Sequence, residues 1–88
     1  MSDDIDAAFE RAADEVTKLP ERPAGDDLLE LYAFYKQGTE GDVTGKRPGF
    51  TDFVGRAKFD AWSRIQGLEQ DEAKRAYVRK VEALKSGG

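Results

Sequence analysis

The 88-residue sequence contains neither cysteine nor histidine. Their absence excludes disulfide bonds, Cys/His zinc sites and catalysis by an imidazole or a thiolate, and with them most hydrolase and metalloenzyme chemistry. No segment approaches the roughly 18 consecutive apolar residues that a membrane-spanning helix needs. The opening residues, Met1-Ser2-Asp3-Asp4, are acidic where a secretory signal would be basic. We therefore expect a cytoplasmic protein with no stable membrane insertion and no metal site.

A surplus of positive charge is also missing. The sequence has 14 basic and 18 acidic residues, a formal net charge of -4, which argues against a nucleic-acid binder because affinity for the phosphate backbone comes from surplus Lys and Arg. The charge is uneven: residues 1–31 hold three basic and ten acidic residues, whereas residues 32–88 hold eleven basic and eight acidic ones. The second part can therefore form a local basic pocket for a small anion. The alternative is that these charges only solvate helix faces.

The aromatic content predicts a folded domain. Five Phe, three Tyr and one Trp are too many for a disordered polar chain, although only 39% of the residues are hydrophobic. At this length the core suffices for one domain over residues 1–88. We expect a disordered tail at residues 86–88.

Apolar residues recur at steps of three and four along most of the chain, which predicts four helices. The first is capped by Ser2 or Asp3 and stopped by Pro20, and the second runs from a cap at Asp26 or Asp27 to about Gln37. The other two extend from Thr51 or Asp52 to Gly67, with Phe53 on the inner stripe, and from about residue 70 to 85. No alternating β-branched run occurs. The predicted fold class is all-α, a four-helix bundle.

The connection between the second and third predicted helices spans residues 38–51, which is long for so small a domain. A short loop would force these two helices to be antiparallel. The longer connection permits an overhand crossing with the two helices parallel.

Aromatic and cationic side chains cluster on the predicted helices. Tyr32, Tyr35 and Lys36 have the spacing i, i+3 and i+4, so they share one face of a single turn. Lys58 and Tyr77 lie on the third and fourth helices. Together they provide flat rings to stack on a base, hydroxyl groups to donate hydrogen bonds, and ammonium groups to hold a phosphate. Taken individually, each Tyr can also lie at the edge of the core with its hydroxyl group in water, and each Lys can be a surface residue that increases solubility.

These residues belong to a larger pattern. It consists of Tyr32-Ala33-Phe34-Tyr35-Lys36-Gln37-Gly38-Thr39, Gly41-Asp42, Arg47-Pro48-Gly49-Phe50, Asp52-Phe53, Ala57-Lys58-Phe59-Asp60-Ala61-Trp62 and Ala76-Tyr77-Val78. In this order and separation, the motifs closely resemble the acyl-CoA-binding protein family, and the resemblance extends from Phe9 to Leu84. It implies an up-down-down-up bundle that holds a fatty acyl-coenzyme A thioester.

The resemblance also implies residue roles. Tyr32 and Tyr35 would contact the adenosine end, Lys36 and Lys58 would pair with the ribose 3'-phosphate, and Tyr77 would contact the phosphopantetheine and thioester. The acyl chain would follow a groove lined by Phe9, Ala13, Leu28, Leu29, Ala57 and Phe59. Two positions depart from the family: many relatives carry Trp at the position of Phe59, and some carry Lys at the position of Thr17.

The function expected from these features is non-catalytic binding, transport and buffering of medium- to long-chain fatty acyl-CoA by a monomer without a cofactor. Acyl-CoA-using enzymes are candidate partners. Two alternatives remain. One is a small helical module that docks a partner helix on its aromatic face. The other is an enzyme acting on acyl-CoA, in which only Ser63 or a carboxylate is left as a nucleophile.

Overall fold

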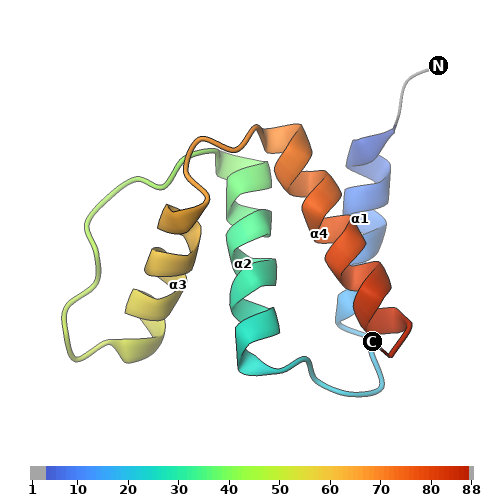
Figure 1. Ribbon diagram of the computed structural model, residues 1–88, viewed down its shortest axis with the longest axis horizontal. Coiled ribbons are helices and arrows are strands. Elements are labelled where there is room, and N and C mark those ends of the chain that lie inside the picture. Colours follow the sequence, from blue (N-terminus) through green and yellow to red (C-terminus); the bar gives the residue numbers. More distant parts are fainter. Residues whose placement is uncertain (1–3, 88) are drawn as a thin grey trace.

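The computed structural model describes residues 4–87. Four helices follow one another: α1 (Ile5–Val16), α2 (Gly25–Glu40), α3 (Phe53–Arg64) and α4 (Gln70–Lys85). No strand occurs among the described residues, which confirms the all-α class. In Figure 1, α1 and α4 run in one direction and α2 and α3 in the other. The topology is therefore up-down-down-up, with α2 and α3 parallel as expected from the long connection.

The helix starts follow from their capping residues. The side chain of Asp4 accepts a hydrogen bond from the N–H of Ala7 at the start of α1, and Asp52 does the same for Gly55 in α3. The caps predicted for α1, Ser2 and Asp3, lie outside the described residues. The predicted cap of α2 was wrong. Ala24 precedes this helix without a side-chain hydrogen bond, and both aspartates lie inside the first turn, where their charge still stabilises the helix N-terminus.

The helix ends also differ in part from the prediction. α2 continues three residues beyond Gln37, and Gly41, with a φ of 87°, ends it. Gly38 lies within α2 because it packs tightly against α4: a Cβ atom there would be 2.9 Å from Cγ of Lys74. At the other end of the chain, the N–H groups of Ser86 and Gly87 bond to carbonyl oxygens of the last turn of α4. These two residues of the expected tail are thus part of a hydrogen-bonded turn.

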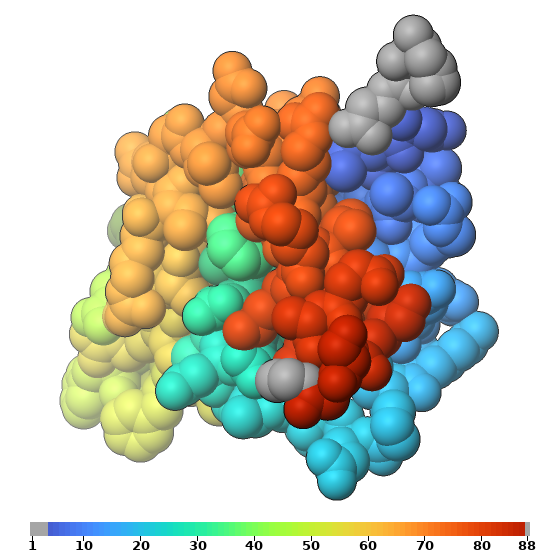
Figure 2. Space-filling view, turned by 45° about the vertical axis from the view of Figure 1, so that its right-hand side comes forward, coloured from blue at the N-terminus to red at the C-terminus, as the bar shows by residue number. Residues whose placement is uncertain are grey.

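The helices form a flat array in which α4 and α2 occupy the middle. α2 packs on α4 and on α3, α4 packs on α1, and the described parts of α1 and α3 do not contact each other. Figure 2 shows α4 between α1 and α2. The core cluster consists of Phe9, Ala12, Leu31, Tyr77 and Val81. No described helix has the length and apolar character needed to cross a bilayer.

The prediction that Phe53 faces inward was wrong. Phe53 is 77% exposed, whereas Ala61 and Trp62 are buried. The reason is tertiary: among the described helices, α3 packs only against α2, so its first turn lies free of the core.

A buried glutamine joins the ends of α2 and α3 to the loops. The Gln37 Nε2 atom donates to Oδ1 of Asp42 and to the carbonyl oxygen of Leu68, each at 2.8 Å. Its Oε1 atom accepts from Nε1 of Trp62 at 3.2 Å, and the same indole donates to the carbonyl oxygen of Gly41 at 2.9 Å. Further along, Arg47 pairs bidentately with Asp60. These bonds hold the long connection against α3.

Candidate functional site

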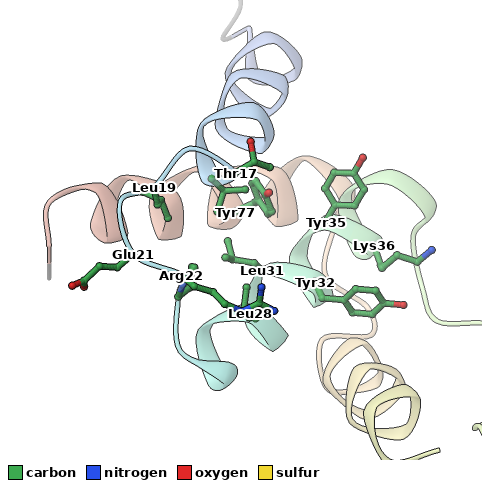
Figure 3. A pocket seen from close by; sticks show the side chains of 12 residues that line it. Thr17, Leu19, Glu21, Arg22, Leu28, Leu31, Tyr32, Tyr35, Lys36 and Tyr77 are labelled. Carbon is green, nitrogen blue, oxygen red and sulfur yellow. The ribbon is translucent and has the colours of Figure 1, made fainter.

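A cavity of about 740 Å³ lies between α2, α4 and the segment that joins α1 to α2 (Figure 3). Its size is typical of small-molecule sites. The lining residues are Val16, Thr17, Leu19, Glu21, Arg22, Pro23, Leu28, Leu31, Tyr32, Tyr35, Lys36 and Tyr77. The cavity therefore combines aliphatic and aromatic walls with cationic groups.

Four of the five predicted head-group residues line this cavity: Tyr32, Tyr35, Lys36 and Tyr77. The first three share one face of α2, as their spacing predicted, and Tyr77 comes from α4. Because α2 and α4 pack against each other, residues separated by more than 40 positions form one wall.

The tyrosines rest on a buried phenylalanine. The ring centroid of Phe9 is 5.3 Å from that of Tyr35 and 5.0 Å from that of Tyr77, and the two tyrosine rings are 5.9 Å apart. Tyr77 is only 4% exposed. Burial, followed by the nearby Tyr35, raises the pKa of the Tyr77 phenol. Tyr77 therefore presents a neutral hydroxyl group that is able to donate a hydrogen bond.

Lys36 is held at the edge of the cavity by two neighbours. Its ammonium group bonds to the carboxylate of Glu40, one turn along α2, and lies 5.1 Å from the ring centroid of Trp62. The bond to Glu40 raises the pKa of Lys36, with smaller contributions from Tyr32 and Tyr35. Lys36 is therefore a permanent cation at neutral pH. Its charge is balanced by the carboxylate of Glu40.

Lys58 lies beside the cavity. Its Nζ atom is 5.3 Å from the ring centroid of Tyr32, although Lys58 is not a lining residue. The structure thus brings both predicted lysines, from α2 and α3, close to aromatic rings at one end of the site. The part of the chain that the structure describes holds no carboxylate cluster able to bind a metal ion.

The predicted acyl groove is only partly found at this cavity. Leu28 lines it, whereas Ala13, Ala57 and Phe59 are not among its lining residues. Leu29 lines a separate cavity of about 520 Å³ between α2 and α3. Neighbouring helical residues differ by about 100° around the axis, so Leu28 and Leu29 face different spaces. Phe9 lies in the core below the tyrosines.

Sequence reasoning missed the contribution of the α1–α2 segment, which it treated only as a turn. Arg22 lines the cavity and forms no ion pair with a described residue. Figure 3 shows its side chain beside Leu28, while Glu21 extends the other way. The available signal was Arg22 between Pro20 and Pro23, two residues that restrict the turn. Arg22 thus adds a cation to the cavity that Thr17 also lines.

Comparisons with known proteins agree with one another. The family model for "Acyl CoA binding protein" matches residues 6–81. An acyl-CoA-binding protein homolog of Manduca sexta is 48% identical over 77 residues, covering 86% of each chain, and homolog 1 of Caenorhabditis elegans is also 48% identical, covering 88% of this chain and 90% of its own.

Solved structures show the same likeness. The crystal structure of Oryza sativa acyl-CoA-binding protein 2 matches with a TM-score of 0.90 and 37% identity, over 94% of this chain and 90% of its own. That of the protein from Moniliophthora perniciosa matches with a TM-score of 0.84 and 41% identity, over 98% of this chain and 83% of its own.

Proposed function

The chain belongs to the acyl-CoA-binding protein family, and from this premise we propose that it binds medium- to long-chain fatty acyl-CoA esters without catalysing a reaction on them. Such a ligand has a multiply charged nucleotide head and an apolar tail. The cavity has the matching character, since Leu19, Leu28 and Leu31 line it together with Arg22 and Lys36.

The observation that carries the proposal is the arrangement of cations around Tyr32. Lys58 reaches its ring from α3, and Lys36 lies one turn further along α2. In our proposal, Tyr32 and Tyr35 contact the adenosine, and the two lysines bind the 3'-phosphate. Charge-assisted hydrogen bonds of this kind are about twice as strong as neutral ones. Tyr77 then donates to the phosphopantetheine or the thioester.

The acyl chain adds affinity in proportion to its buried length. Each buried methylene contributes about 0.8 kcal/mol before ordering costs. In our proposal the chain follows Leu28 and the apolar residues predicted as the groove. Longer chains should therefore bind more tightly until the groove is filled.

The hydroxyl groups near the site support binding rather than catalysis. The Ser63 hydroxyl group donates to the carbonyl oxygen of Phe59 at 2.9 Å, and that of Thr17 donates to Asp14 at 2.7 Å. Ser63 also does not line the cavity, and the sequence has no imidazole to activate either hydroxyl. We therefore propose a carrier and buffer, cytoplasmic in location, that exchanges acyl-CoA with the enzymes that use it.

Isothermal titration with hexadecanoyl-CoA tests the proposal, with free coenzyme A and free hexadecanoate as controls. We expect one-to-one binding of the thioester and much weaker binding of either half. Loss of a hydrogen bond to a charged group, about 1.5–3 kcal/mol, predicts that Lys36→Ala weakens binding by about ten- to a hundredfold. Lys18→Ala is the matched control, because Lys18 is an exposed lysine paired with an acid one turn away but lies outside the site.

A second variant tests whether Glu40 and the ligand compete for Lys36, because a variant that merely disturbed the fold would bind less tightly. Glu40→Gln removes the carboxylate that occupies Lys36, so we expect tighter binding of the thioester. Wild-type affinity in folded Lys36→Ala would contradict the phosphate role. No heat with any of the three ligands would refute the proposed function and favour the partner-docking alternative.

A further inference from the structure

The single tryptophan of the chain lies beside the candidate site and not in it. Trp62 is 7% exposed and is not among the residues that line the cavity, so it offers no surface to a ligand there. Its ring nevertheless lies under the ammonium group of Lys36, which does line the cavity. A buried ring that contacts a site cation without reaching the cavity can act on a ligand only through that cation.

Hydrogen bonds fix the orientation of this ring. The indole Nε1 atom donates to the carbonyl oxygen of Gly41 at 2.9 Å and to Oε1 of Gln37 at 3.2 Å. Gln37 is itself buried and bonded to both neighbouring loops. Because its N–H edge is held by two acceptors, the indole keeps its face toward Lys36. That face carries the negative end of the ring quadrupole and attracts the ammonium group.

A second contact of the same kind occurs one turn earlier on both helices. Lys36 of α2 lies over the ring of Trp62 in α3, 5.1 Å from its centroid. Lys58 of α3 lies over the ring of Tyr32 in α2, 5.3 Å from its centroid. On each helix the ring and the cation are four residues apart, so they share one face. We call these two contacts the crossed pairs, because each helix gives its cation to the ring of the other.

The crossed pairs depend on the parallel direction of α2 and α3, which Figure 1 shows. In parallel helices a step of one turn moves along both axes in the same direction, so a ring meets a cation at both levels. In an antiparallel pair the same spacing would place ring opposite ring and lysine opposite lysine, which brings like charges together. The topology therefore lets two ammonium groups lie at neighbouring levels while each faces an aromatic ring.

An ammonium group that is already held in place binds a phosphate better than one that rotates freely. Lysine has a flexible four-carbon stem, and ordering this stem on binding costs rotamer entropy. Lys36 is drawn toward Glu40 by their ion pair, and the ring of Trp62 is a second partner that keeps the ammonium group at the edge of the cavity. Part of the ordering has therefore taken place before a ligand arrives.

From this arrangement we propose that Trp62 is a positioning residue, which holds Lys36 for the 3'-phosphate and so sets the preference for coenzyme A esters that carry this phosphate over esters that lack it. This inference rests on the function proposed above. Trp62 acts through Lys36 and does not itself touch the ligand. The property that it controls is therefore the discrimination between the two esters, and not the affinity for the acyl chain.

Fluorinated tryptophan tests this role without removing a side chain. Because the chain has a single tryptophan, growth on mono-, di- or trifluorotryptophan changes only the ring of Trp62, weakens its negative face and keeps the indole N–H. Isothermal titration measures the affinities for hexadecanoyl-CoA and for its 3'-dephospho analogue. We expect the ratio of the two affinities to fall stepwise with fluorine content, by about two- to fivefold for the trifluoro form, the range of a cation–π contact. In the Lys36→Ala protein, fluorination should leave the ratio unchanged.

Two variants separate the ring from its volume. Trp62→Leu removes the ring and should lower the affinity ratio by about three- to tenfold, whereas Trp62→Phe keeps a ring and should retain most of the ratio. Ile65→Ala is the matched control. Ile65 follows the last residue of α3 and lines the separate cavity between α2 and α3, so its loss loosens the packing at the same end of the helix. It should leave the ratio unchanged.

Three results would overturn the role of Trp62. One is an affinity ratio that stays constant across the fluorinated series. Another is an equal loss of affinity for both esters, which would show that the ring only stabilises the fold. The third is a fluorine effect that persists in the Lys36→Ala protein. In each of these cases the unsubstituted protein still binds hexadecanoyl-CoA, whereas an absence of that binding would refute the proposed function and this inference with it.

Discussion

Replacing the buried amide of Gln37 should destabilise the whole bundle. This side chain is only 1% exposed and makes three hydrogen bonds, to Asp42, Leu68 and Trp62. It thereby connects the end of α2 with the long connection, with α3 and with the turn before α4. Gln37→Leu keeps most of the volume and removes all three bonds.

The magnitude follows from the partners. The bonds to Leu68 and Trp62 are between neutral groups, each worth about 0.5–1.5 kcal/mol, and the bond to the Asp42 carboxylate is worth about 1.5–3 kcal/mol. Two partners keep another bond: the indole of Trp62 still donates to Gly41, and Asp42 still accepts from the N–H of Gly67. We therefore expect a loss of about 3 kcal/mol, a large part of the 5–15 kcal/mol typical of a small domain.

Guanidinium denaturation, followed by circular dichroism and by the fluorescence of the single tryptophan, measures this loss. Gln66→Leu is the matched control, because Gln66 is exposed in the turn after α3 and surface substitutions typically change stability by less than about 0.5 kcal/mol. A Gln37→Leu protein within about 1 kcal/mol of the wild type would refute the view that the buried amide holds the loops to the helices.

Four further predictions concern the site and its pH dependence. Arg22→Ala should weaken hexadecanoyl-CoA binding about two- to fivefold, as expected for an exposed cation, and the difference should shrink at high salt; an unchanged affinity would remove Arg22 from the site. Tyr77→Phe should keep the unfolding midpoint, because the described contacts of Tyr77 are ring contacts. It should weaken hexadecanoyl-CoA binding about two- to tenfold through one lost hydrogen bond. Equal affinity of the variant and the wild type in titration would contradict the donor role of Tyr77. The affinity for hexadecanoyl-CoA should be constant from pH 7 to 9, because the pKa of Lys36 is raised above 10.5 and the chain has no histidine. The affinity should fall below about pH 6, because the phosphate monoester of the ligand gains a proton there. An ester lacking the 3'-phosphate should not show this loss. The hydrogen bond from Gly67, followed by that from Gln37, lowers the pKa of Asp42 below 3.8. The carboxylate therefore stabilises the fold above pH 3.8, and this stability is lost as the pH falls through the lower pKa of the folded state. Asp42→Asn should remove that part of the acid dependence of stability, as measured by urea titrations at different pH values.

Features encoded by neighbouring residues were predictable. α4 begins and ends at the predicted residues, because three buried residues, Ala73, Tyr77 and Val81, repeat at four-residue steps and define one face. Asp52 as the cap of α3 and the shared face of Tyr32 and Lys36 also depend only on local spacing. Local capping has limits, however: α2 starts without the predicted side-chain cap, because packing on α4 and α3 stabilises this helix in its place.

The candidate site was predictable to the extent that its residues lie on one helix face or carry a family motif. Arg22 was missed because a turn between two prolines has no periodicity that indicates where its side chain points. Phe53 was placed wrongly for the opposite reason. Apolar character predicts that a residue prefers burial, but which space it faces depends on the neighbouring helix.

By itself the sequence determined four amphipathic helices, their approximate ends, the absence of thiol and imidazole chemistry, and a cluster of tyrosines and lysines. Only the tertiary structure decided that α2 and α3 run parallel, since the long connection permits that direction without requiring it. It also decided that Lys58 meets Tyr32, that Arg22 faces the cavity, and that the apolar side chains near the start of α3 stay exposed. The physical reason is the same in each case: helix periodicity is a local property of the backbone, whereas these contacts join residues that are close only after the helices have packed.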